Sequence, residues 1–283
     1  MPKKKTNKEL IDKFLEDHQK EKKVSEGTLK TYKNIGDNLP FNILSSQPTI
    51  IKKLKELYEN PNTLQLYLNM IILVRRYNEE ETDKLIKLRN SLKDEIIKNR
   101  KENLTKLDES LPNADKVFEE LDKLSGLRYI INYLMMHHAL RNKDINLKFV
   151  KALPKNKTEN YIMMKGKNIL LNINSYKTEE KYGSKEINIS NEKFIDEIKK
   201  MKLDDGDYLL TKKNGDKISN ISTFNDKVLH LTIDKLGQNK IVKIMIKDLI
   251  NNKSFDKLEQ MSKDRGTSID VLLKSYNLYN GDK

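Results

Sequence analysis

The sequence predicts a mainly α-helical fold with one small β-sheet, an α+β arrangement in two domains. Apolar residues recur at helical spacing through most of residues 7–101. Apolar content then falls over residues 104–113, which marks a linker. A chain of 283 residues has room for two domains, which we place at residues 1–103 and 114–283. After the linker, three short runs rich in β-branched residues predict strands at 161–164, 168–173 and 186–189.

The N-terminal region predicts a helical bundle that begins with two short amphipathic segments. Thr49 is the expected N-cap of the next helix. Asn60-Pro61-Asn62 predicts a turn, after which Thr63 caps another helix. That helix is apolar nearly all round, so we expect it at the centre of the bundle. A densely charged helix over residues 81–101 completes the domain.

The C-terminal region predicts helices on both sides of the sheet. Helices at 114–124 and 126–140 precede the first strand. Lys165-Gly166-Lys167 is the expected turn of a hairpin, and a longer connection at 177–185 leads to the third strand. The sheet should therefore be three-stranded and antiparallel. Further helices are expected at 192–201, 221–236, 242–251, 255–263 and 268–276.

Charge and composition restrict the class of protein. Lys and Arg total 55 residues against 42 Asp and Glu, a net charge of +13. This excess favours a polyanionic partner, most commonly nucleic acid, although a bias toward Lys, Asn and Ile inflates it. The absence of cysteine and the presence of only four histidines argue against disulfides, a cysteine nucleophile and zinc. We expect no metal and no small-molecule cofactor.

Two further features concern location. No apolar run approaches membrane-spanning length, and the N-terminus has no signal-peptide core. We therefore expect an intracellular protein that is not secreted and has no membrane partner.

Arg141 stands between two apolar stretches. A helical run ends at Leu140, and apolar residues resume at Ile145 and Leu147. An arginine in this position cannot be buried without a partner. It either points into a polar cleft or pairs with Asp144, three residues further on. A surface arginine at a helical corner is the simpler interpretation.

The order of these features resembles the tyrosine recombinases, also called the phage-integrase family. The features are a helical bundle, a linker, a Leu-Arg-x-x-Asp motif, a small sheet that carries lysines, further helices and a tyrosine near the C-terminus. The resemblance extends over residues 20–280. It implies an N-terminal core-binding (SAM-like) bundle and a C-terminal domain of the recombinase catalytic type.

The resemblance assigns roles to three residues that keep the family's residue type. Arg141 is similar to the arginine of the family's first motif, and Lys177 to the lysine of its β-hairpin, with Lys181 and Lys185 as rivals. Gly266 matches the glycine of a Gly-His pair. Tyr276 lies nine positions after Thr267, the residue that follows Gly266, and this is the family's spacing from the histidine of that pair to the nucleophilic tyrosine. Tyr279 is a rival nucleophile; tyrosines that anchor a C-terminal helix are the simpler interpretation.

Three other positions depart from the family pattern. The best match to the family's His-x-x-Arg box places Ile244 at the histidine and Lys247 at the arginine. The later histidine position is Thr267. Lysine keeps the charge of arginine but loses its planar, bidentate fork. Removal of one oriented donor from a phosphoryl-transfer site costs about 10²–10³ in rate.

The resemblance implies a metal-free reaction on double-stranded DNA. In the family, the tyrosine attacks a phosphodiester and forms a 3′-phosphotyrosyl link, arginines and histidines hold the phosphate charge, and the lysine protonates the departing 5′ oxygen. With the departures above, we expect a DNA-binding protein whose strand cleavage is weakened or lost. The alternatives are an active integrase with a variant site and a virion or scaffold protein that keeps the fold. The protein could form a homo-oligomer on DNA. Its location could be the host nucleus, a viral factory, a virion or the bacterial cytoplasm.

Overall fold

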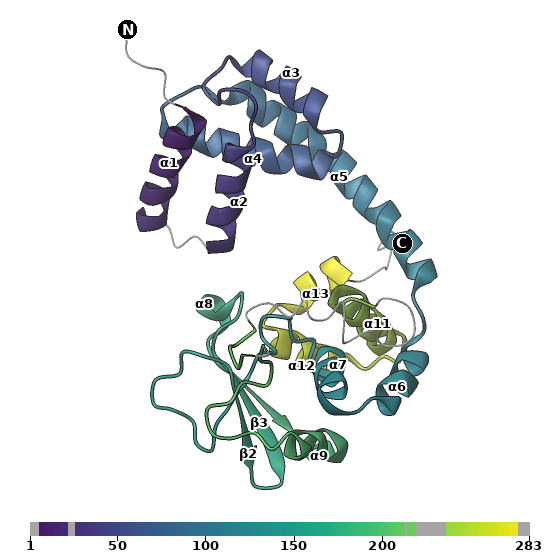
Figure 1. The fold of residues 1–283 in the computed structure, drawn as a ribbon. Helices are drawn as coiled ribbons and strands as arrows, with labels where there is room; N and C mark the ends of the chain where they lie inside the picture. Colours follow the sequence, from purple (N-terminus) through teal and green to yellow (C-terminus); the bar gives the residue numbers. More distant parts are fainter. Residues whose placement is uncertain (1–5, 22–25, 213, 219–235, 277–283) are drawn as a thin grey trace. The chain divides into compact units, whose positions relative to one another are not determined.

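The computed structural model describes residues 6–21, 26–212, 214–218 and 236–276 (Figure 1). This part of the chain is mostly helical and contains one small sheet. The chain divides into two compact units, Met1–Lys106 and Leu107–Lys283, and each has a hydrophobic core of its own. No helix among the described residues is both long and apolar enough to cross a membrane.

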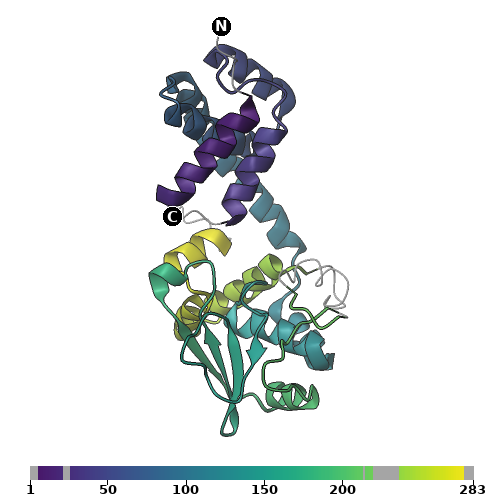
Figure 2. The same cartoon turned by 60° about the vertical axis from the view of Figure 1, so that its left-hand side comes forward.

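The first unit is a helical bundle, as the apolar spacing predicted. Helices α1 and α2 lie side by side, and both pack against α4 (Figures 1 and 2). The apolar sequence of α4 makes it the centre of the unit, where Leu68, Ile71 and Val74 are fully buried. The helices are α1 (Asn7–Glu21), α2 (Glu26–Asp37), α3 (Gln47–Leu57), α4 (Pro61–Tyr77) and α5 (Asp83–Ser110).

Two helices of this unit begin earlier than predicted. Helix α3 begins at Gln47, so Thr49 lies inside its first turn instead of capping it. Helix α4 begins at Pro61 with Asn60 as its N-cap, and Thr63 is again inside the helix. Proline suits a first helical turn because its fixed φ is helical and its missing N–H is not needed there. The predicted turn around Pro61 is therefore a helix start.

The charged helix predicted to end at residue 101 continues through Ser110. Most of the predicted linker at 104–113 is therefore helical, and the two compact units divide within this helix, after Lys106. A segment without a regular apolar stripe can still be helical, since Leu, Lys and Glu, all present between residues 104 and 110, have high helix propensity. Asn113 then caps the next helix.

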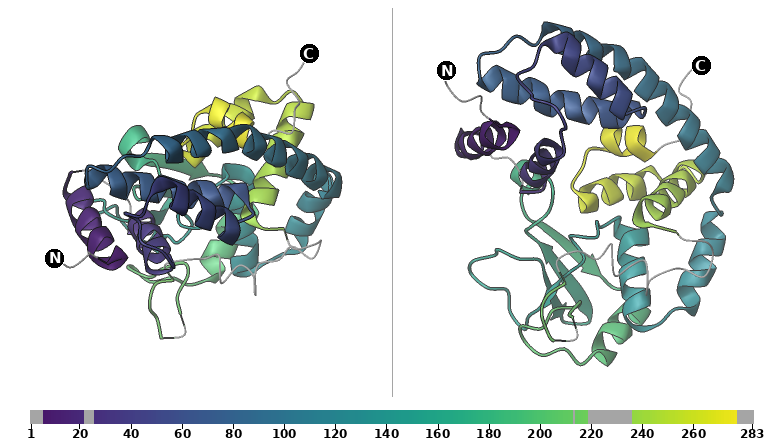
Figure 3. Two further views of the ribbon diagram at one scale, coloured as in Figure 1. Left: turned by 90° about the horizontal axis from the view of Figure 1, so that it is seen from above. Right: turned by 45° about the horizontal axis from the view of Figure 1, so that its top comes forward.

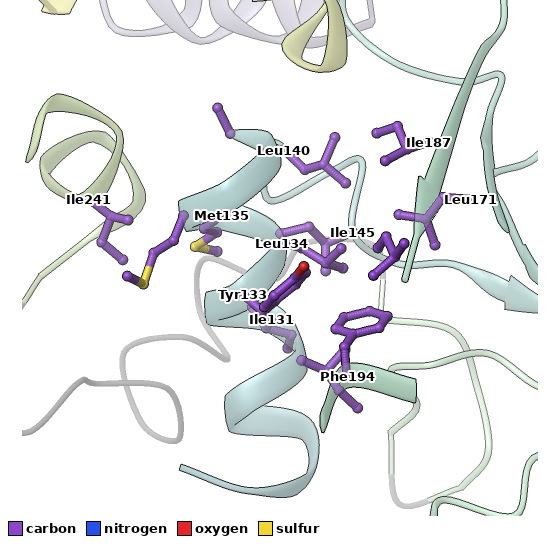
Figure 4. Close-up of a cluster of buried hydrophobic side chains, with 14 of the residues drawn as sticks. Ile131, Tyr133, Leu134, Met135, Leu140, Ile145, Leu171, Ile187, Phe194 and Ile241 are labelled. Carbon is purple, nitrogen blue, oxygen red and sulfur yellow. The ribbon is translucent and has the colours of Figure 1, made fainter. Parts of the chain in front are cut away.

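Helix α7 is central to the second unit, where it contacts α6, α9, α11 and α12. Figure 4 shows it between Ile241 of α11 on one side and Phe194 of α9 with the strand residues Leu171 and Ile187 on the other. Helices α11 and α12 lie side by side, and α13 follows α12 (Figure 3). The helices are α6 (Ala114–Lys123), α7 (Gly126–His138), α8 (Glu179–Tyr182), α9 (Glu192–Lys200), α11 (Gln238–Asn251), α12 (Phe255–Arg265) and α13 (Ile269–Tyr276). The helix predicted at 221–236 lies, apart from Leu236, outside the described residues.

The sheet is four-stranded and mixed, so the prediction of a three-stranded antiparallel sheet was wrong. Strands β2 (Tyr161–Lys165), β3 (Asn168–Ile173) and β4 (Lys185–Ile189) form an antiparallel part close to the predicted positions. Strand β1 (Lys148–Phe149) adds an edge and runs parallel to β2. Two residues are too few to show an alternating pattern, and a parallel partner carries no hairpin signal in the sequence.

Candidate functional site

The site is built around the end of α7. The helix stops at His138 because Ala139 adopts a left-handed conformation, with φ 49° and ψ 28°. Ala139 and Leu140 are fully buried, which fixes the turn against the core. Arg141 then opens a second tight turn, which closes when the Asp144 N–H donates to the Arg141 carbonyl at 2.8 Å.

The C-terminal end of α12 packs against these turns. Arg141 Nη1 donates to the carbonyl of Arg265 at 2.5 Å, and Arg265 Nη1 donates to the carbonyl of Ala139 at 2.6 Å. His138 Nδ1 lies 2.6 Å from Asp264 Oδ2. The last carbonyls of a helix lack partners within the helix and carry partial negative charge, so they attract cationic donors.

The start of β4 and the connection that leads to it from β3 supply a third side of the site. Lys185 Nζ donates to the carbonyl of Asp264 at 2.6 Å and lies 3.8 Å from the centre of the Tyr176 ring. Thr178 Oγ1 donates to the carbonyl of Gly266 at 2.5 Å. Gly266 has φ +64°, and a Cβ there would lie 2.3 Å from the Tyr176 ring, so this position requires glycine. Three consecutive carbonyls, 264 to 266, therefore each accept a hydrogen bond from a side chain.

Arg141, Asp144, Lys185, Asp264 and Arg265 are called the Arg141 cluster below. Asp144 is only 1% exposed, and its Oδ2 lies 3.8 Å from Arg141 Nη1. Burial raises the pKa of Asp144, although the positive charges of Arg141 and Lys185 oppose the shift. Burial likewise lowers the pKa of Lys185 to about 8, with Asp144 opposing the shift and Arg141 adding to it. The part of the chain that the structure describes holds no group of three His, Asp or Glu side chains arranged to bind a metal ion.

The lysines predicted for the hairpin occupy different surroundings. Lys177 is exposed, whereas its neighbours Tyr176 and Thr178 both contact Gly266. Lys181 is also exposed, with Nζ 5.3 Å from the centre of the neighbouring Tyr182 ring. Lys185, the second rival, is the lysine that the fold brings against Asp264.

The two positions matched to the family's His-x-x-Arg box, Ile244 and Lys247, both lie on α11. Ile244 is 3% exposed and belongs to the hydrophobic core. Lys247 is exposed and lines a pocket with Ala114 and Asp115 at the start of α6. The buried lysine of α11 is Lys243, 6% exposed, which sequence reasoning passed over.

The candidate tyrosines come shortly after the end of α12 in the chain. Thr267 is half-buried in the turn between α12 and α13, where its N–H donates to the Ser262 carbonyl at 3.0 Å. Tyr276 is the last residue of α13. Tyr279 lies outside the described residues. Gly266 and Thr267 thus connect the Arg141 cluster to the helix that ends in the candidate nucleophile.

Sequence reasoning missed His138, Asp264 and Arg265 as parts of the site. Their contacts join residues 124 or 126 positions apart, so no local spacing could reveal them. One signal was present: an acidic and a basic residue stand directly before Gly266, the glycine that ends α12. Charged side chains at such a helix end are close to its unpaired carbonyls.

Comparison with known proteins finds eight solved chains that are similar in structure. No protein-family model matches the chain, and no curated protein matches it. The chain is similar to a solved structure described as the crystal structure of XerA recombinase, with a TM-score of 0.42 and 15% sequence identity. The similarity covers 96% of this chain and 94% of that chain. A likeness of this degree describes the fold coarsely and assigns no role to any residue.

Proposed function

We propose that this protein binds double-stranded DNA with a fold of the tyrosine-recombinase type, and that its strand cleavage is weakened or lost. The observation that carries the proposal is that Arg141, from the turn after α7, and Lys185, from β4, both bind the end of α12, whose last residue, Arg265, binds back to the carbonyl of Ala139. The net charge of +13 supports a polyanionic partner for the chain as a whole.

Arg141 is the residue best suited to a DNA phosphate. Its side chain is 19% exposed, and one of its guanidinium nitrogens is fixed by the Arg265 carbonyl. A guanidinium carries several N–H donors in a rigid plane, so the remaining donors can bind two phosphate oxygens. Lys185 would add a second positive charge near the same place, most strongly below the pKa of about 8 that burial gives it.

Two positions support the loss of cleavage. Ile244 is an apolar, buried residue where the resemblance expects a phosphate-contacting histidine. Thr267 stands at the later histidine position. Since the family relies on such donors to hold the transition-state charge, their loss should slow phosphoryl transfer more than it weakens ground-state binding.

The test is binding of a labelled duplex at graded salt. Affinity should fall steeply with salt, and Arg141→Gln should weaken binding about tenfold and reduce the salt slope by about 1. Lys200→Gln is the matched control, because it removes an exposed charge paired with Glu197 on α9, outside the Arg141 cluster. If the wild-type protein fails to bind even at low salt, DNA is not its partner and a scaffold role is favoured.

The same protein should be incubated with a nicked suicide duplex, which traps any covalent protein–DNA adduct. We expect no adduct on the time scale of an active recombinase. An adduct that forms with the wild-type chain and disappears in Tyr276→Phe would show that cleavage survives, and would overturn that half of the proposal while leaving DNA binding intact.

A further inference from the structure

We propose that Arg265 is a positioning residue that fixes the guanidinium of Arg141 for a phosphate. This inference rests on the proposed DNA-binding function. It extends that function to a residue outside every motif that the sequence resemblance marks.

The two arginines are held by a reciprocal exchange of hydrogen bonds. Arg265 Nη1 donates to the carbonyl of Ala139, the left-handed residue that ends α7. Arg141 Nη1 donates back to the carbonyl of Arg265. Each side chain therefore ties down the backbone segment from which the other arginine projects. Loss of the Arg265 guanidinium would release the turn of Ala139 and with it the base of Arg141.

The backbone carbonyl that receives Arg141 is itself immobilised on both sides. Lys185 and Thr178 bind the carbonyls directly before and after it. Asp264 is paired with His138 through Oδ2 and accepts from Gln260 Nε2 through Oδ1 at 2.7 Å. A fixed acceptor gives Arg141 a fixed orientation before any ligand arrives. This fixed orientation removes part of the conformational entropy that a freely rotating arginine side chain would lose when it binds a phosphate.

Burial separates the roles of the two arginines. Arg265 is 4% exposed, whereas the Arg141 side chain is 19% exposed. A guanidinium that deep in the unit acts on a ligand through its neighbours, and the Ala139 carbonyl is one of them. We therefore assign phosphate contact to Arg141 and positioning to Arg265.

The test combines DNA binding with a measurement on Arg141 itself. Arg265→Met keeps an unbranched apolar stem but removes the donors of the side chain, and Arg265→Lys keeps the positive charge and one donor nitrogen. Each is made in the wild-type and Arg141→Gln backgrounds. Arg265→Met should weaken duplex binding about tenfold, as Arg141→Gln does, and the double variant should bind no more weakly than Arg141→Gln alone. Arg265→Lys should recover part of the loss.

In parallel, side-chain ¹⁵N NMR of the DNA-free protein reports whether rotation of the Arg141 guanidinium is hindered. We expect hindered rotation in the wild-type protein and averaged signals in Arg265→Met. Lys193→Met is the control, because Lys193 also donates to a backbone carbonyl, that of Asp122, but lies outside the Arg141 cluster. It should leave the Arg141 signals unchanged.

Two results would overturn the inference: losses that multiply in the double variant, or Arg141 signals that are unaltered in Arg265→Met. The NMR measurement needs no DNA, so it decides the positioning role even if the wild-type chain binds no duplex and the proposed function fails. If Arg265→Met does not fold, Arg265→Lys takes its place, because it keeps the charge but replaces the planar guanidinium that binds the Ala139 carbonyl. Averaged Arg141 signals in that variant would support the inference, and unchanged signals would refute it.

Discussion

At the scale of single residues, Lys185 is held between a backbone carbonyl and an aromatic ring. Its ammonium group donates to Asp264 and lies over Tyr176, with the buried carboxyl of Asp144 nearby. This burial lowers the pKa of Lys185 to about 8. An unfolded chain would keep its lysines near the ordinary pKa of about 10.4.

The pKa of Lys185 predicts a rise in stability with pH. Below about pH 8, both the folded and the unfolded protein carry this charge, so the cost of burying it is present in full. Between about pH 8 and about 10.4 the unfolded chain binds more protons at this site, so the free energy of unfolding should increase through that window. Urea unfolding at several pH values measures it.

The diagnostic quantity is the difference between the wild-type protein and Lys185→Met, since tyrosines also titrate at the alkaline end. The Lys185→Met variant should lack the rise, whereas Lys181→Met, at an exposed position of α8, should keep it. Equal slopes in wild-type and Lys185→Met protein would contradict the assignment of the lowered pKa.

The residues of the site were predictable to different degrees. Arg141 could be singled out because an arginine between apolar stretches requires a partner, and its turn with Asp144 is local. The choice between Lys177 and Lys185 could not be made, because it depends on strand register. Lys185 pairs with Ile173 across β3 and β4, which turns it toward the end of α12. Only tertiary structure supplies that information.

At the scale of elements, Arg75 joins the loop before α3 to the segment between α4 and α5. Its Nη1 donates to the carbonyls of Ile43 and Ser45, both at 2.8 Å, and its Nε donates to the carbonyl of Glu81 at 2.9 Å. Nη2 lies 3.2 Å from Glu80 Oε2. Arg75 is 3% exposed, so it holds these two segments together from inside the first unit.

We expect Arg75→Met to lower the free energy of unfolding by about 3 kcal/mol, because it removes hydrogen bonds to three carbonyls and leaves them without their charged donor. Arg76→Met is the matched control. Arg76 is the next residue and is exposed, so its loss should change stability by less than about 0.5 kcal/mol. Chemical denaturation followed by circular dichroism compares the two, and similar midpoints would contradict the role of Arg75.

Helix starts could be predicted from the sequence where apolar residues recurred at helical spacing over several turns. Helices α6, α7, α9 and α12 begin at the predicted residues, because each carries an apolar stripe and begins after a recognisable boundary. Strand β1 and the last turns of α5 lack such a stripe. The first is specified by its partner β2, and the second by helix propensity without burial.

At the scale of the whole molecule, the two hydrophobic cores share no residue. The buried residues of one run from Leu10 to Leu92, and those of the other from Ala114 to Leu272. Every member of the Arg141 cluster, together with Ala139, Tyr176 and Thr178, belongs to the second unit. A unit with its own core and its own polar contacts should fold as a unit.

We therefore expect a fragment of residues 107–283 to fold alone and to keep the site, since it retains the whole of the second core. The measurements are cooperative thermal unfolding and the Arg141 side-chain NMR signals, which should match those of the full chain. A fragment of residues 107–263 is the control. It lacks Asp264, Arg265 and Gly266, so the hindered Arg141 signals should be lost. Two outcomes would contradict this expectation: residues 107–283 could be unfolded on their own, or the full chain with Arg75→Met could lose both units in a single transition. Either outcome would mean that the two cores are energetically coupled and that the division into independent units is wrong.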